Sequence, residues 1–123
     1  MKLSIILLTF FLGGTIYVLL ELLWRGRSHV SMFCAGGLAL LLLHGLFFRF
    51  ALPLFAQCLL GGLVITAIEF VAGAIVNVRL KLNVWDYSKM PLNLYGQVCL
   101  PFSLLWCLLT LPISFLSSYL ATL

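Results

Sequence analysis

Two glutamates are the residues of this chain best suited to chemistry. Glu21 and Glu69 each lie in a stretch that is otherwise hydrophobic enough to cross a bilayer. An acid near the centre of a membrane helix costs on the order of 2.5 to 3.5 kcal/mol on insertion scales, so its presence there marks a functional site by default. We expect both carboxylates to face the interior of a helix bundle and to bind a proton, a metal cation or an amine-bearing solute.

A long polar stretch follows Glu69 and holds further site candidates. It contains the third acid of the chain, Asp86, between Trp85 and Tyr87. One interpretation is an interfacial loop, because Trp and Tyr anchor at headgroup depth. If the loop instead folds back between the helices, it brings these side chains over the level of the two glutamates. The predicted substrate-binding residues are Glu21, Arg25, Glu69, Asn77, Trp85, Asp86, Tyr87, Asn93 and Gln97, with Asn93 and Gln97 one turn apart at the start of the last helix.

Each acid also has a structural interpretation. Glu21 precedes Arg25 by one helical turn, in the order that favours a local ion pair. Glu69 has no basic residue one turn away and lies deeper in its hydrophobic stretch. A purely structural role therefore accounts for Glu69 less well than for Glu21.

The elements that must position these residues are membrane helices. The chain has 123 residues, 64% of them hydrophobic and 8% charged, against about 25% charged in soluble domains. A spanning helix needs about 20 mostly apolar residues. The sequence thus predicts an all-α, single integral membrane domain with four spans, at about 3–23, 31–48, 50–77 and 93–119.

Positively charged residues indicate how the helices are oriented. Cytoplasmic loops carry an excess of Lys and Arg, and five of the seven cations fall in the first and third loops. We therefore predict a cell (inner) membrane protein with both termini outside and the first and third loops cytoplasmic. The net charge of +4 reflects this topology and contact with membrane lipids, so no nucleic-acid partner is expected.

Glycine pairs suggest both helix packing and an internal repeat. A shift of 48 residues superimposes two segments that run from a glycine pair to a glutamate. A true repeat would give two parallel-related helical hairpins, with a site at their interface. Small residues also let membrane helices approach closely. The glycines predicted to mark helix crossings are Gly13, Gly14, Gly61, Gly62 and Gly73.

Motifs for a cofactor, a metal or nucleophilic catalysis do not stand out. The four cysteines form no CxxC pair, and His29 and His44 lack a third ligand at recognisable spacing. We expect no cofactor and no metal site. No phosphate-binding GxxxxGK[ST] loop occurs, so any ATP hydrolysis is expected from a partner ATPase.

Four motifs resemble a known family of small bacterial membrane proteins. Two of them, Glu-Leu-Leu-Trp-Arg at residues 21–25 and Trp-Asp-Tyr-Ser at residues 85–88, are the most specific. The others run over residues 69–78 and 93–101. Together they resemble the family labelled "putative ABC-transporter type IV permeases". The resemblance implies transport, and it implies neither a substrate nor a set of catalytic residues.

Three functions follow from these features. The leading one is a transporter or transporter subunit with an intramembrane acidic site formed by Glu21, Glu69 and Asp86. Because one four-helix chain is small for a pathway, we expect a homo-oligomer. The second is a membrane enzyme acting on a lipid or lipid-linked substrate, with Asn77, Arg79 or Lys81 holding an anionic headgroup; enzymatic activity is the less favoured reading. The third is an assembly subunit of a larger membrane complex.

Overall fold

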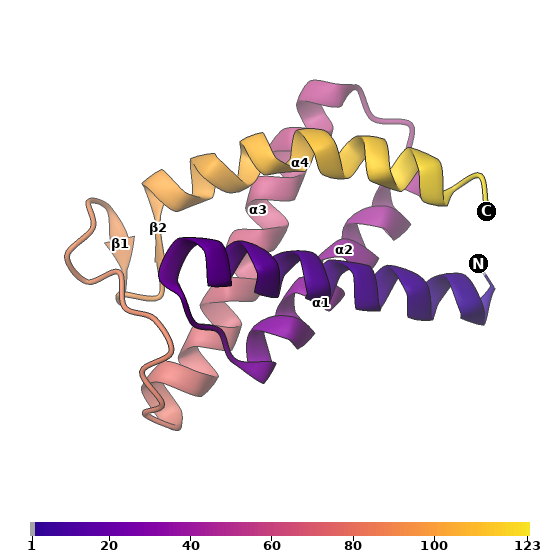
Figure 1. Cartoon of the computed structure of the whole chain (residues 1–123). Helices are drawn as coiled ribbons and strands as arrows, with labels where there is room; N and C mark the ends of the chain where they lie inside the picture. Colours follow the sequence, from indigo (N-terminus) through magenta and orange to yellow (C-terminus); the bar gives the residue numbers. More distant parts are fainter. Residues whose placement is uncertain (1) are drawn as a thin grey trace.

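The protein is a bundle of four helices, each long and apolar enough to cross a membrane. The computed structural model describes residues 2–123. Consecutive helices run in opposite directions, and the start of α1 and the end of α4 lie on the same side of the molecule (Figure 1). The predicted fold class, an all-α membrane protein with four spans, is confirmed. The elements are α1 (Leu3–Arg25), α2 (Val30–Arg49), α3 (Leu54–Gly73), the π-helical turn η1 (Ala74–Arg79), β1 (Asn93–Leu94), β2 (Val98–Cys99) and α4 (Leu100–Leu120).

Local sequence signals set the helix ends. Gly26 ends α1 in the left-handed conformation, with φ of 74°, which glycine adopts without steric cost. His29 caps α2, because its ring Nδ1 accepts the Ser31 backbone N–H at 3.1 Å. The extended residue Pro53 precedes α3, so this helix begins at 54 rather than at the predicted 50. It continues through η1 to Arg79, two residues beyond the prediction.

The last helix begins seven residues later than predicted. Asn93 and Gln97 lie in a tight antiparallel hairpin, in which Asn93 pairs with Cys99 and Leu94 with Val98. The hairpin turns through Gly96 at φ of 71°, a conformation incompatible with a right-handed helix. The prediction that Asn93 and Gln97 lie one turn apart on a helix is therefore wrong. Helix α4 starts at Leu100, and Pro101 occupies its first turn, where a missing N–H costs nothing.

The first two helices form one closely packed hairpin through their glycines. A Cβ added to Gly13 would lie 2.5 Å from the Gly36 carbonyl oxygen and 3.1 Å from the Gly37 Cα. A Cβ on Gly14 would lie 2.7 Å from the Phe33 carbonyl oxygen. The two backbones thus pack at a distance that only glycine allows.

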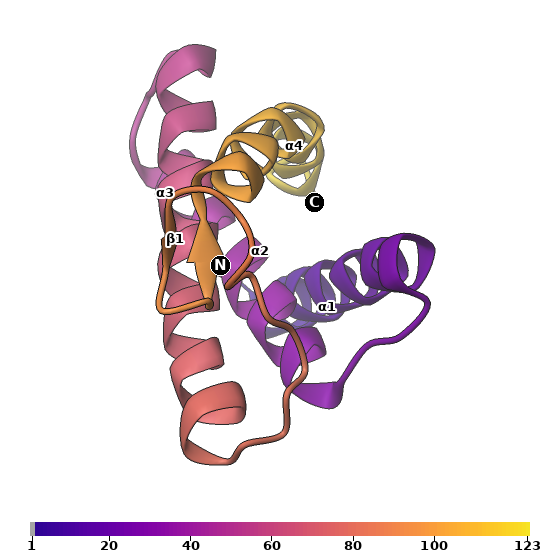
Figure 2. The same cartoon turned by 90° about the vertical axis from the view of Figure 1, so that its left-hand side faces the viewer.

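The last two helices form a second hairpin, again at a glycine pair. Cβ atoms on Gly61 and Gly62 would overlap the side chains of Thr110 and Cys107 on α4. In both hairpins the glycine pair lies where a helix meets its successor. Figure 2 views α1 and α4 nearly end-on and shows them apart from one another, whereas α3 is seen from the side and crosses next to α4.

The connection between η1 and β1 folds back against the bundle. Trp85 is only 3% exposed, and its indole Nε1–H donates to the Gln97 carbonyl oxygen at 2.8 Å. Gly73 on α3 makes room for this loop, since a Cβ there would lie 3.0 Å from the Trp85 ring. The loop is therefore packed protein structure that closes one end of the bundle.

Candidate functional site

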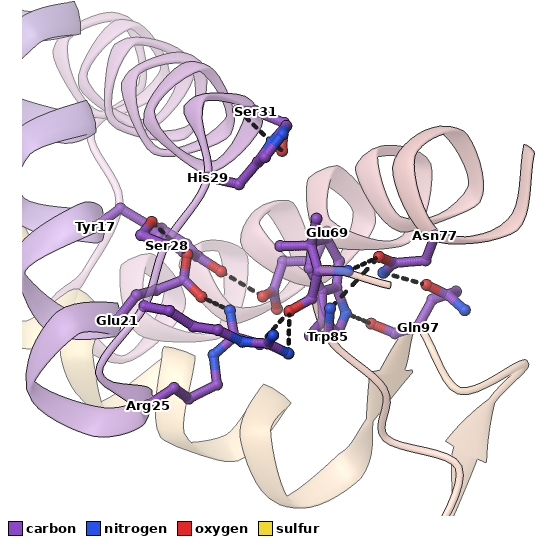
Figure 3. Close-up of polar contacts among 12 residues, drawn as sticks. Tyr17, Glu21, Arg25, Ser28, His29, Ser31, Glu69, Asn77, Trp85 and Gln97 are labelled. Atoms are coloured by element: carbon purple, nitrogen blue, oxygen red, sulfur yellow. Dashed lines mark hydrogen bonds and ion pairs between the residues drawn. The ribbon is translucent and has the colours of Figure 1, made fainter. Parts of the chain in front are cut away.

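The Glu69 carboxylate is the most deeply buried acid of the structure, with 3% of the residue exposed. Its Oε1 accepts the Trp106 indole N–H at 2.6 Å, and its Oε2 accepts the Tyr17 hydroxyl. Figure 3 shows Tyr17 and Glu69 pointing toward one another from different helices. Helices α1, α3 and α4 thus meet at this one carboxylate.

Among the described residues, no Lys or Arg side chain forms an ion pair with this carboxylate. Within residues 2–123, the ion pair formed is the one between Glu21 and Arg25. Both hydrogen bonds to Glu69 therefore come from neutral donors. Hydrogen bonds satisfy the oxygens but leave the charge without a counter-ion in a low-dielectric environment.

Glu21 has a different environment from Glu69. It forms the ion pair with Arg25 expected from their spacing and accepts the Ser28 hydroxyl at 3.2 Å. Arg25 also donates to the Val84 carbonyl oxygen at 2.9 Å. This pair therefore ties the end of α1 to the polar loop near Trp85 and leaves Arg25 locally neutralised (Figure 3).

Asn77 and Gln97 are occupied in holding the loop. The Asn77 Nδ2 donates to Gln97 Oε1 at 2.9 Å, and its Oδ1 accepts the Val84 backbone N–H at 2.7 Å. Gln97 Nε2 donates in turn to the Tyr95 carbonyl oxygen at 2.8 Å. These polar atoms fix the loop conformation, and Trp85 packs among them.

Asp86 and Asn93 lie on the outer side of the loop. Asp86 Oδ1 accepts the Ser88 backbone N–H at 2.9 Å in an exposed turn. Asn93 donates to the Met90 carbonyl oxygen at 2.9 Å and accepts the Gly96 N–H at 3.0 Å. Over residues 2–123, no hydrogen bond joins Asp86 to Glu21 or Glu69. The structure therefore brings Glu21, Arg25 and the loop together near Glu69 and leaves Asp86 outside this group.

Tyr87, which follows Asp86, turns inward. Its ring stacks on Phe102 of α4, with centroids 4.9 Å apart and an interplanar angle of 17°. Burial, with the nearby Glu69 carboxylate as the second cause, raises the pKa of the Tyr87 phenol above its ordinary value. The group therefore stays neutral across the physiological range.

Aromatic residues outside the predicted set complete the site. Phe102 contacts Trp24 edge-to-face, with ring centroids 6.1 Å apart. The ring centroids of Trp106 and Tyr17 lie 5.7 Å apart. A sequence signal for Trp106 exists, because a buried indole N–H needs an acceptor and the chain has only three acids. For Phe102 and Trp24 no such signal exists, since apolar aromatics are common throughout the chain.

Two adjoining cavities run between α1 and α4. The larger cavity has a volume of about 310 Å³ and an almost wholly apolar lining that includes Ile16, Leu43 and Ile113. The smaller cavity, of about 130 Å³, contains Glu21 and Arg25 at its polar side. Four residues line both cavities: Tyr17, Leu20, Trp106 and Leu109. Glu69 lies behind two of these, because Tyr17 and Trp106 are its hydrogen-bond donors.

Comparison with models of protein families shows which family the chain belongs to. The model of the family described as "Putative ABC-transporter type IV" matches residues 9–122. The chain belongs to this family. The predicted resemblance is therefore confirmed, and the protein is a multi-pass membrane protein of an ABC-transporter type. Comparisons with curated proteins and with solved structures give no match.

In this member of the type IV family, the candidate site is formed by the side chains around Glu69. Among residues 2–123, no group of three or more His, Cys, Asp and Glu side chains is arranged to hold a metal ion. What the arrangement offers is a buried carboxylate, a neutralised ion pair and a wall of aromatic rings beside two cavities. These groups attract and surround positive charge.

Proposed function

We propose that this protein is a transporter, or the membrane subunit of a transporter, for a proton or a cationic solute, with Glu69 at the centre of its site. The observation that carries the proposal is the buried Glu69 carboxylate, which is hydrogen-bonded by Tyr17 and Trp106 and has no ion-pair partner within residues 2–123. An ionised carboxylate without compensation is expensive in a low-dielectric environment. Uptake of a proton or an organic or inorganic cation relieves that cost.

The net charge of the site supports a cationic substrate. The charged groups of the site are Glu21 and Arg25, which line the smaller cavity, and Glu69, which lies behind Tyr17. With both acids ionised these three groups sum to one negative charge, because Arg25 is paired with Glu21. Arg27 is exposed at the loop and reaches the Val84 carbonyl oxygen only at 3.4 Å. A monovalent cation therefore neutralises the site.

The cavities support a lateral route to the site. They lie between α1 and α4, which pack mainly against α2 and α3 rather than against each other. A small motion of either helix would change access to Tyr17 and Trp106 and hence to Glu69. Such a change would be coupled to the hydrogen bonds that Glu69 accepts from both helices.

We further propose the cellular setting that this function requires. The protein would lie in the inner membrane with both termini outside and the first and third loops cytoplasmic, where positive residues are enriched. A homo-oligomer would supply the additional helices of a pathway. A partner ATPase would supply any ATP hydrolysis, at the cytoplasmic loops.

Flux measurements in proteoliposomes test the proposal. Purified wild-type protein, Glu69→Gln and Thr66→Val would be compared for movement of protons, rubidium, methylamine and tetramethylammonium. Thr66 is a matched control, because it lies one turn from Glu69 on α3 and donates instead to the Ser103 hydroxyl at 2.8 Å. We expect flux of at least one of these species in the wild type and in Thr66→Val, and at least a tenfold loss in Glu69→Gln. Equal flux in Glu69→Gln, or no flux by folded wild type, would contradict the proposal.

A further inference from the structure

Five aromatic rings surround the smaller cavity. They are contributed by α1, the loop after η1 and α4, and their residues are Tyr17, Trp24, Tyr87, Phe102 and Trp106. We call this set the aromatic cage. Phe102 is central to it, with ring centroids at 4.9 Å from Tyr87, 6.1 Å from Trp24 and 6.3 Å from Trp106. Aromatic cages next to acidic groups recognise quaternary ammonium ions, because ring faces attract cations.

Glu69 holds two rings of the aromatic cage in place by hydrogen bonds. The Tyr17 hydroxyl and the Trp106 indole N–H both donate to its carboxylate, so their polar hydrogens point away from the cavity. The hydrogen bonds to an anion also shift electron density toward the two rings, which increases their attraction for a cation. Glu69 is thus a positioning residue for the cage as well as its source of negative charge.

The larger cavity extends the cage into an apolar chamber. It adjoins the smaller cavity at Tyr17, Leu20, Trp106 and Leu109, and its wall beyond them is hydrocarbon. The smaller cavity, at about 130 Å³, holds several times the roughly 30 Å³ that one water occupies in the liquid. The space therefore suits a compact organic headgroup in the cage with an alkyl chain beside it.

We propose that the two cavities together bind an amphiphilic ammonium ion, with its headgroup in the aromatic cage and its alkyl chain in the larger cavity. This proposal rests on the proposed function only in that Glu69 supplies the negative charge. The occupant is specified by charge complementarity: an anionic amphiphile would meet Glu69 and Glu21 without a free cation, because Arg25 is already paired with Glu21. A lipid acyl chain alone would fill the larger cavity and leave the cage unused.

Equilibrium dialysis of detergent-solubilised protein tests this inference with three probes. Hexyltrimethylammonium carries both headgroup and chain, tetramethylammonium only the headgroup, and hexyl sulfate the same chain with an anionic group. Each buried methylene improves affinity by up to about fourfold, so we expect hexyltrimethylammonium to bind at least tenfold more tightly than tetramethylammonium. Hexyl sulfate should show no saturable binding. Equal binding of the cationic and the anionic hexyl probes would overturn the inference.

Variants of the cage separate it from a general apolar surface. Phe102→Leu should weaken the binding of hexyltrimethylammonium about five- to tenfold. Phe102→Tyr, which keeps the ring, should bind it as the wild type does. Phe70→Leu is the matched control, because Phe70 lines neither cavity and packs instead against Tyr95, with ring centroids 6.3 Å apart. Equal effects of Phe102→Leu and Phe70→Leu in folded protein would overturn the cage.

The outcomes distinguish this inference from the proposed function. Binding of hexyltrimethylammonium without any flux would uphold the cage and contradict transport. Flux of protons or methylamine that needs Glu69, without binding of hexyltrimethylammonium, would uphold transport and overturn the cage.

Discussion

Replacing Tyr17 with phenylalanine isolates one hydrogen bond of the site, because it removes the hydroxyl that donates to Glu69 and keeps the ring. A hydrogen bond to a charged group contributes about 1.5 to 3 kcal/mol in water-soluble proteins. Between membrane helices the average for polar pairs is nearer 0.6 kcal/mol, since the unfolded chain also finds partners in the membrane. Glu69 is 3% exposed and would retain only Trp106 as donor. We therefore expect Tyr17→Phe to lower the free energy of unfolding by about 1.5 kcal/mol, between these two limits.

A double-mutant cycle shows whether the charge of Glu69 is responsible. In Glu69→Gln the amide can accept from Trp106 and donate to the Tyr17 oxygen, so Tyr17→Phe should there cost only about 0.5 to 1 kcal/mol. Unfolding by sodium dodecyl sulfate in mixed micelles, followed by tryptophan fluorescence, gives the four free energies. Tyr119→Phe is the control, since Tyr119 is 63% exposed, and it should change stability by less than about 0.5 kcal/mol. Equal losses from Tyr17→Phe in the two backgrounds would refute the charge-assisted bond.

The remaining predictions concern helix packing, the loop and pH. Gly13→Leu should destabilise the protein by about 1 to 3 kcal/mol through overpacking in the same unfolding assay, whereas Gly45→Ala, with nothing within 4 Å of its added Cβ, should not; equal losses would contradict the close packing of α1 on α2. Asn77→Leu should expose the loop and speed its cleavage by protease at least tenfold, because the Val84 N–H loses its acceptor; unchanged cleavage would show that the side chain does not hold the loop. Since the pKa of Tyr87 is raised, its neutral form persists above its ordinary titration range, and binding of hexyltrimethylammonium to wild type and Tyr87→Phe should follow the same pH profile between pH 7 and 9.5. A rise in affinity over that interval only in the wild type, where a phenolate would attract the cation, would mean that Tyr87 ionises at its ordinary pKa.

The sequence determines the helices well because hydrophobic length alone specifies a membrane span. The predicted starts and ends of the first two helices lie within two residues of the observed ones. The error at Asn93 and Gln97 has a specific cause. Because an apolar run follows their segment, the sequence predicts that they form the first turn of the last helix. Tyr95 and Gly96 both adopt positive φ instead. The hairpin is stabilised by loop contacts that the sequence does not reveal.

The site was predicted only in part, because its geometry depends on which helices are neighbours. Spacing along one helix is sufficient to pair Glu21 with Arg25. No local pattern connects Glu69 with Tyr17, 52 residues away, or with Trp106 on another helix. The charge of Asp86 suggests a place beside the glutamates, whereas its position in the loop follows from the turn at Ser88.

Uptake of hexyltrimethylammonium into proteoliposomes shows whether the Glu69 site carries a cation across the membrane, because this permanently charged ion needs a carrier to cross a bilayer. We expect saturable uptake under an inside-negative potential by the wild type and by Thr66→Val, and at least tenfold slower uptake by Glu69→Gln. Uptake by Glu69→Gln at the wild-type rate would contradict the claim that the buried Glu69 site moves cations, as would folded wild-type protein that takes up neither this ion nor protons nor methylamine.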